Sequence, residues 1–249
     1  MYPLFYYLKQ GSSHTFHKGV PSLLNKMLRE KKLDLAPCSS IEYAKNYKSY
    51  KLIPSISISS IKEVKSVALF SNYKLKELDA KPVYVTSESG TSVILFKILS
   101  LFFLDISPIY VNKEPLSIDS HMLIGDKALY MYYNNKFKYV YDMGKLWHKY
   151  TGLPFVYALW ILNDIEDNNG EYLDFIQDLE KIKNNSKKNL SALLDGYSLK
   201  GLSSYQIIDY WETIDYNLSD KHTEGLLLFY KYAYKLNMIP EIPPLKFYI

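Results

Sequence analysis

Residues 81–106 read KPVYVTSESGTSVILFKILSLFFLDI, and this stretch decides the fold class. Its first apolar run alternates like a strand, and the apolar run after residue 92 has the longer period of a helix. Between the two runs, residues 86–92 carry five hydroxyl side chains, one glutamate and one glycine. A strand that leads through a short polar turn into a helix is the repeating unit of an α/β fold.

Two interpretations of this polar turn are open. The unpaired backbone N–H groups of a helix N-terminus, together with hydroxyls and a glycine that allows close approach, form a cradle for an anion. The turn lacks the lysine of a phosphate-binding P-loop, which favours a carboxylate over a nucleotide. In the other interpretation Ser89 or Thr91 only caps the helix, and the remaining hydroxyls face water.

The rest of the first 160 residues repeats the alternation of strands and helices. Helices are expected at 20–32, 39–47 and 89–103. Strands or strand–helix transitions are expected at 33–40, 50–60, 64–71, 81–87, 107–112 and 121–133. From residue 172 to the end the pattern is mostly helical. This order predicts mostly parallel sheets, with the ligand site beyond the carboxyl ends of the strands.

Three of the expected strand ends carry small polar side chains. They are the ends at Cys38, Ser39 and Ser40, at residues 86–92, and at Gly125 and Asp126. Asp126 has two interpretations, because it could bind a substrate hydroxyl or act as a base, or it could cap the helix that follows. We expect a candidate site where these strand ends meet.

The composition excludes several classes of protein. With 48% hydrophobic and 22% charged residues among 249, the chain has the make-up of a soluble globular protein. A net charge of +4 from scattered basic residues does not predict nucleic-acid binding. No run reaches the roughly 18 to 20 apolar residues of a membrane span, and the first residues do not resemble a signal peptide. The single Cys38 excludes an internal disulfide and a multi-cysteine zinc site, and it is compatible with a reducing cytosol.

Other polar residues are interpreted as structural. Cys38 is expected to be a buried, inert thiol, and Glu42 a favourable acid in the first turn of a helix. The histidines are dispersed, without an i, i+4 pair, and are expected at surface or packing positions: His14, His17, His121, His148 and His222.

Several phrases, taken in order, resemble the chorismate dehydratases of menaquinone biosynthesis by the futalosine route. The phrases are GVPSLLNKML (19–28), DLAPCSSIEYAKN (34–46), LIPSISIS (52–59), VKSVALFS (64–71), SESGTSVILFKIL (87–99), LIGDKAL (123–129) and WHKYTGLPFVYALW (147–160). The tail YWETIDYNLSDKHTEGLLLFYKYAYKLNMIP (210–240) also fits, so the resemblance covers essentially the whole chain.

The resemblance implies an α/β fold like the type II periplasmic binding proteins, used here by a cytoplasmic enzyme, with a mostly helical C-terminal segment. Two lobes, joined by two crossing strands, would close on an anionic ligand in the cleft between them. Lobe one is expected at residues 1–70 plus 160–249, and lobe two at 71–159. The crossings are expected near 66–71 and 155–160.

The resemblance also implies the reaction, in which chorismate loses water to give 3-[(1-carboxyvinyl)oxy]benzoate. By matching motifs, Ser66 would lie close to the reacting ring as the catalytic residue, and the turn residues Ser89, Thr91 and Ser92 would hold a carboxylate. The remaining substrate-binding residues would be Ser39, Ser40, Gly125 and Asp126. Because aromatisation of the ring supplies driving force, no cofactor, metal or strong nucleophile is expected. The expected partner is a small dicarboxylate, without nucleic acid or membrane, and a substrate carboxylate could itself take the proton.

The N-terminus departs from the family. Members begin with a strand and an asparagine that would precede Met1 here, so the chain is expected to lack the family's first strand. We favour a start assigned at an internal methionine over a shortened, inactive protein, because the other motifs look intact.

Two alternatives share the fold. One is a binding protein that holds a small carboxylate without chemistry, and a signal peptide or lipoprotein cysteine would favour it. The other is the sister enzyme that makes 1,4-dihydroxy-6-naphthoate, although CSSIEYA and TGLPFVYALW fit the dehydratase better. A DNA-binding regulator is not expected, because no helix-turn-helix segment precedes the domain.

Overall fold

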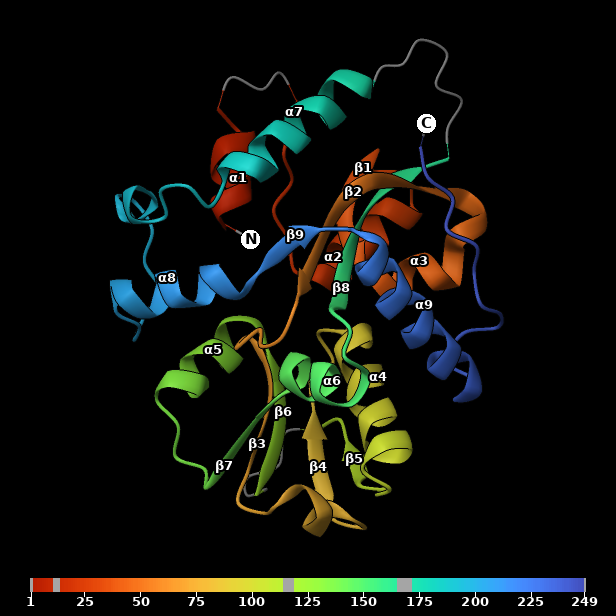
Figure 1. The fold of residues 1–249 in the computed structure, drawn as a ribbon, viewed down its shortest axis with the longest axis vertical. Helices are drawn as coiled ribbons and strands as arrows, with labels where there is room; N and C mark the ends of the chain where they lie inside the picture. Colours follow the sequence, from red (N-terminus) through yellow and green to blue (C-terminus); the bar gives the residue numbers. More distant parts are fainter. Residues whose placement is uncertain (1, 11–13, 114–118, 165–171, 249) are drawn as a thin grey trace.

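Two β-sheets organise the chain, and they lie one above the other in Figure 1. The computed structural model describes residues 2–10, 14–113, 119–164 and 172–248. The first sheet is built from both ends of the chain, and the second from its middle. No described helix is long and apolar enough to cross a membrane.

The first sheet has the strand order β1-β8-β2-β9. Its strands are β1 (Leu35–Ser39), β8 (Phe155–Asn163), β2 (Tyr50–Ser60) and β9 (Asp215–Asn217). The helices of this half are α1 (Tyr2–Leu8), α2 (Pro21–Arg29), α3 (Ser40–Asn46), α7 (Leu173–Asn185), α8 (Ser204–Thr213) and α9 (Asp220–Lys235). The mostly helical C-terminal segment expected from the sequence is confirmed, and the short strand β9 lies between α8 and α9.

The second sheet has the order β5-β4-β6-β3-β7. Its strands are β3 (Val67–Ser71), β4 (Pro82–Val85), β5 (Ile109–Val111), β6 (Ser120–Ile124) and β7 (Tyr139–Asp142). Its helices are α4 (Gly90–Ile98), which continues as a π-turn at Leu99–Phe103, α5 (Gly125–Tyr133) and α6 (Met143–Thr151). The unit of strand, polar turn and helix at residues 81–106 is therefore present as β4 and α4.

The expectation of mostly parallel sheets is wrong. Among the described strands, β4 alone pairs in parallel, with β5 and β6, and Leu52 of β2 makes one isolated parallel bridge to Phe247. Strand β3 is antiparallel to both of its neighbours, and every strand pair of the first sheet is antiparallel. The cause lies in how the chain changes sheets. It leaves the first sheet at Ser60, the end of β2, and re-enters at Phe155, the start of β8, and these two residues are paired in the register. A strand that returns at the end where its neighbour left must run in the opposite direction.

Two short segments join the sheets, which we call the outward crossing (residues 61–66) and the return crossing (residues 152–154). The crossings expected at 66–71 and 155–160 fall just after these segments, largely inside β3 and β8. The two expected lobes stay a prediction, because strand pairing defines sheets and does not define units that move. These lobes are residues 1–70 plus 160–249, and residues 71–159.

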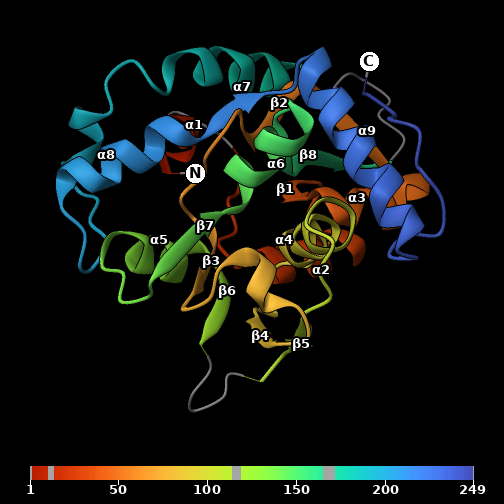
Figure 2. The same cartoon turned by 60° about the horizontal axis from the view of Figure 1, so that its bottom comes forward.

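One apolar core runs from the first sheet into the helices of the second. It includes Leu159 of β8, Phe96 of α4, Trp147 of α6 and Phe229 of α9, all completely buried. Figure 2 shows α4, α6 and α9 gathered on the same side of the molecule. Burial of such large side chains contributes most of the stability of a domain, so the two sheets are firmly packed together on this side.

Candidate active site

Polar strand ends of the second sheet meet at one edge. Because β4 and β6 are parallel neighbours, their carboxyl ends at Val85 and Ile124 lie at the same edge. Strand β3 is antiparallel to β6, and Val67 pairs with Ile124, which brings the preceding Ser66 to that edge as well. The edge therefore gathers the 86–92 turn and Gly125, as expected for a site beyond the carboxyl ends of strands, and it adds Ser66 from the amino end of the antiparallel β3.

The 86–92 turn caps helix α4. The Ser92 N–H donates to Ser89 Oγ at 3.3 Å, and the Ser89 hydroxyl donates to Ser92 Oγ at 3.1 Å. The capping interpretation is thus confirmed for Ser89. The expectation that the remaining hydroxyls face water holds for the exposed Ser87 and is wrong for Thr91 and Ser92, which are almost fully buried.

Helices α3 and α4 meet at their N-termini, although they follow different sheets. Thr91 Oγ1 accepts a hydrogen bond from the Ile41 N–H at 3.1 Å and lies 3.4 Å from Ser40 Oγ. Two helix N-termini that face each other place two sets of unpaired N–H groups and two partial positive charges close together. The arrangement attracts a negative charge.

Ser39 and Ser40 are both held by the protein itself. The Asn25 amide donates to Ser39 Oγ at 3.0 Å, and Asn25 Oδ1 accepts from the Ser39 N–H at 3.3 Å. The Ser40 carbonyl accepts from the Tyr230 hydroxyl at 2.7 Å. Asn25 was not predicted for this position, because it lies on an amphipathic helix that is interpreted as packing.

Ser66 joins the strand end of β6 to helix α8. Its carbonyl accepts from the Gly125 N–H at 2.8 Å, and its side chain lies near the phenol of Tyr210 on α8, where it counteracts the rise in the pKa of Tyr210. Gly125 has φ +61°, and a Cβ added there would meet nothing within 4 Å, so open space adjoins its backbone. Asp126 is exposed in the first turn of α5.

Two tyrosines near Asp126 belong to this group and were missed in the sequence. Burial raises the pKa of Tyr210, and the charge of Asp126 raises it further. Burial and the same charge raise the pKa of Tyr197 to about 12. Both phenols therefore stay protonated at neutral pH and can donate hydrogen bonds. No local motif marks them, because α8 reaches this edge only through the folded arrangement of the sheets.

Cys38 and Glu42 are structural, as expected. Burial raises the pKa of Cys38 to about 12, and the nearby negative charge of Glu42 contributes to this rise. The thiol therefore stays protonated and unreactive. The Glu42 carboxylate is buried in an ion pair with Arg29 and accepts from the Tyr50 hydroxyl at 3.1 Å. The role of Glu42 thus goes beyond the helix-terminal acid expected from the sequence.

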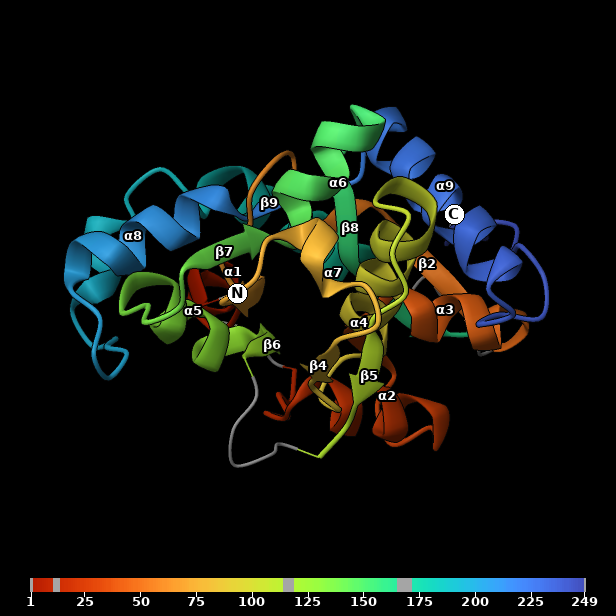
Figure 3. The same cartoon turned by 90° about the horizontal axis from the view of Figure 1, so that it is seen from below.

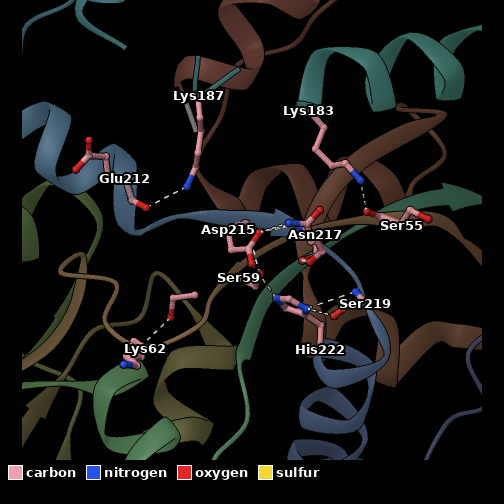
Figure 4. Close-up of polar contacts among 12 residues, drawn as sticks. Ser55, Ser59, Lys62, Lys183, Lys187, Glu212, Asp215, Asn217, Ser219 and His222 are labelled. Atoms are coloured by element: carbon pink, nitrogen blue, oxygen red, sulfur yellow. Dashed lines mark hydrogen bonds and ion pairs between the residues drawn. The ribbon is translucent and has the colours of Figure 1, made fainter. Parts of the chain in front are cut away.

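A second polar cluster lies away from this edge, beside a cavity of about 560 Å³ lined by α7, β9 and the outward crossing (Figure 4). Ser219 Oγ lies 2.8 Å from Nδ1 of the buried His222, and Nε2 of His222 lies 3.2 Å from Asp215 Oδ2. A serine, a histidine and an aspartate in a row suggest a nucleophile, but Ser219 is the N-cap of α9, and its N–H also points at Nδ1. We interpret the three as a helix cap. No group of three or more metal-ligating side chains occurs among the described residues.

Comparisons with known proteins give a consistent set of relatives. A family profile described as "Menaquinone biosynthesis" matches residues 1–235. The chain is 34% identical over 164 residues to a chorismate dehydratase of Campylobacter jejuni, and 33% identical over 177 residues to one of Thermus thermophilus. These alignments cover 63% and 64% of this chain and 60% and 64% of the relatives, so the chain spans less than two thirds of their length.

Solved structures agree on the fold. A crystal structure of an Archaeoglobus fulgidus protein superimposes with a TM-score of 0.73 at 16% identity, covering 96% of this chain and 94% of the other. The alkanesulfonate-binding protein SsuA from Xanthomonas axonopodis pv. citri gives 0.62 at 11% identity, covering 91% and 83%. The expected likeness to periplasmic binding proteins is confirmed, and at these identities it concerns the fold alone.

Proposed function

The chain belongs to the menaquinone biosynthesis family, and on that premise we propose that it converts chorismate to 3-[(1-carboxyvinyl)oxy]benzoate and water. The observation that carries the proposal is sequence identity. The aligned part of the chain is 34% and 33% identical to the chorismate dehydratases of two different bacteria. The reaction is a lyase reaction, and we propose the cytoplasm as its place.

The chemistry suits the side chains at the candidate site. The ring hydroxyl of chorismate leaves, a proton leaves the neighbouring carbon that bears the enolpyruvyl ether, and the ring becomes aromatic. Because both carboxylates of the substrate remain, the protein has to hold two negative charges and stabilise the departing hydroxyl. Hydroxyl and backbone N–H donors in a pre-formed arrangement supply this without a strong nucleophile.

The proposed roles follow the geometry of the edge. The α4 N-terminus with Ser89, Thr91 and Ser92 would hold one carboxylate, and the facing turn at Ser39 and Ser40 would support it from the first sheet. Ser66 would lie beside the leaving hydroxyl, with its backbone held by the Gly125 N–H and the protonated Tyr210 nearby. The open backbone at Gly125 and the exposed Asp126 would border the ring.

The substrate would lie between residues 1–70 plus 160–249 on one side and 71–159 on the other, which we propose as two lobes. In support, Ser40 follows a strand of the first sheet and Thr91 a strand of the second. A ligand bound at both helix N-termini would hold the two sheets together.

The test is a chorismate assay read by mass spectrometry. We expect a product lighter than chorismate by one water, and we expect Ser66→Ala to slow its formation by roughly 100-fold, the loss seen when one well-placed transition-state donor is removed. A protein that binds chorismate but leaves its mass unchanged would contradict the proposed reaction and leave a carboxylate-binding role.

A further inference from the structure

The outward crossing makes a tight turn directly before Ser66. The Ser66 N–H donates to the Val64 carbonyl at 2.7 Å, which closes a three-residue turn around Lys65. Lys65 has φ +61°, in the left-handed region that residues with a side chain rarely adopt. Strain of this kind persists only where the surroundings hold it, and it gathers at functional sites.

Lys65 differs from every other described residue with such a backbone. Five further non-glycine residues have positive φ, and all five are exposed: Lys31, Ser55, Ala80, Asp105 and Asn237. Lys65 alone is buried, with a side chain that is only 7% exposed. An exposed turn can adopt this conformation freely, whereas a buried lysine at such a position requires specific partners.

The backbone of the turn is held by the second sheet. The carboxylate of Asp142, at the end of β7, accepts from the Val64 N–H at 3.0 Å and from the Lys65 N–H at 2.6 Å. Its other oxygen accepts from the Lys145 N–H at 2.9 Å and caps α6. The turn is therefore fastened to the N-terminus of α6.

The side chain of Lys65 is held by helix α8 of the other half. Its ammonium lies 2.6 Å from Asp209 Oδ1, and the second oxygen of Asp209 accepts from the Tyr133 hydroxyl of α5. Burial raises the pKa of Asp209, but the hydrogen bonds from Lys65 and Tyr133 outweigh it and hold the pKa below its usual value. Figure 3 shows α8 and α5 side by side.

We propose that Lys65 and Asp209 are positioning residues, whose ion pair fixes the strained turn and thereby the direction of Ser66 at the candidate site. The inference deepens the proposed function and rests on it for its kinetic readout. Lys65 directly precedes Ser66, and Asp209 directly precedes Tyr210, which lies near the Ser66 side chain. The structural alternative is that the pair only neutralises a buried charge.

Kinetics of three variants separate the two explanations. Lys65→Met keeps the length of the side chain and removes its charge, and we expect kcat to fall at least about tenfold with KM within about threefold, because a small misplacement of a reacting group slows the chemical step. Asp209→Asn should reproduce this split while keeping the side-chain shape. Lys65→Arg, which can still pair with Asp209, should recover most of kcat. If Lys65→Met and Asp209→Asn both keep the kcat of the unmodified chain, the proposal is overturned.

The matched control is Lys31→Met, the same substitution at an exposed lysine with φ +55°. It should leave kcat and KM unchanged, and a tenfold loss of kcat there would also overturn the proposal. Where Lys65→Met does not fold, Asp209→Asn decides in its place.

A second readout does not depend on the reaction. The Gly125 N–H donates to the Ser66 carbonyl, so its hydrogen exchange reports whether Ser66 is held. We expect at least about tenfold faster exchange in Asp209→Asn, since loss of the anchor makes local opening easier. If the unmodified chain does not convert chorismate, the proposed function fails, and this exchange rate alone decides the positioning: faster exchange supports it and an unchanged rate overturns it.

Discussion

The hydroxyl oxygens of Ser40 and Thr91 lie 3.4 Å apart and join two helix N-termini that follow strands of different sheets. The same Thr91 oxygen accepts a hydrogen bond from the Ile41 N–H, which lies at the start of α3 and therefore has no acceptor within the helix. The contact therefore sets the distance between the two donor groups that we propose for one substrate carboxylate.

Thr91→Val tests this contact with a side chain of the same shape. The Ile41 N–H would lose its acceptor in a buried place, so we expect the free energy of unfolding to fall by about 1 to 3 kcal/mol. We also expect KM for chorismate to rise about tenfold, since a lost hydrogen bond to a charged group is worth that much. Urea unfolding and steady-state kinetics measure the two effects.

The control for Thr91→Val is Thr151→Val. Thr151 Oγ1 likewise accepts a backbone N–H, from Leu153 at 3.1 Å, but it lies at the far end of α6. We expect a similar loss of stability and an unchanged KM. An equal rise of KM in both variants would show that the effect of Thr91 on binding is only a loss of stability.

Tyr210→Phe should slow the reaction and leave the fold intact. The variant removes the hydroxyl that lies near the Ser66 side chain and keeps the ring, so Ser66 loses a polar neighbour that we propose orients it. We expect kcat to fall by about tenfold to 100-fold, within the range for one positioned donor. The control is Tyr205→Phe on the same helix, where the side chain is 76% exposed and no change is expected. Equal rates for both variants would remove Tyr210 from the site.

Local features of the fold were predictable from the sequence because they depend on neighbouring residues. The helix of α4 and its cap at Ser89 follow from periodicity and from a hydroxyl three residues before the N–H that it accepts. The meeting of the 86–92 turn and Gly125 at one edge also follows, because the carboxyl ends of these two strands are visible in the sequence. Ser66 reaches the same edge because β3 is antiparallel to β6, and only the family resemblance had placed it in the site.

Long-range features were not predictable in this way. The antiparallel first sheet depends on where β8 re-enters beside β2, which no local pattern encodes. Tyr210 and Asp209 reach the site through the packing of α8 on α5, more than 70 residues along the chain. The sequence pattern of α8 shows only an ordinary amphipathic helix.

Asp215 makes stability depend on pH in a defined direction. Burial raises the pKa of Asp215, but contacts with His222 and hydrogen bonds from Asn217 outweigh it and lower the pKa below its ordinary value. A carboxylate with a lower pKa in the folded than in the unfolded chain contributes stability above the unfolded pKa of about 3.9 and loses it as the pH falls through the folded pKa. We therefore expect the stability advantage over Asp215→Asn to be full above the unfolded pKa and to shrink as the pH falls below it.

Urea unfolding of both proteins across this pH range measures the advantage. Asp178→Asn, an exposed carboxylate on α7, is the comparison and should show little dependence. A difference that stays constant from about pH 5 to pH 2 would mean that Asp215 contributes as a polar side chain and not as a charge.

Gly225→Ala should weaken the packing of α9 against the return crossing. A Cβ at Gly225 would lie 2.3 Å from the Pro154 carbonyl oxygen, far inside contact distance, and 3.4 Å from Leu153 Cβ. The carbonyl is itself held by the Trp147 indole N–H at 3.2 Å, so it can retreat only by breaking that bond. We expect the free energy of unfolding to fall by about 1 to 3 kcal/mol or more, the usual result of overpacking.

Gly90→Ala is the matched control on a helix, because its nearest contact would be Ile41 Cγ2 at an ordinary 3.4 Å, and there alanine should be neutral or stabilising by up to about 1 kcal/mol. Equal stability of the two variants would mean that the return crossing moves freely enough to accept the added methyl group, and that α9 does not fix its position.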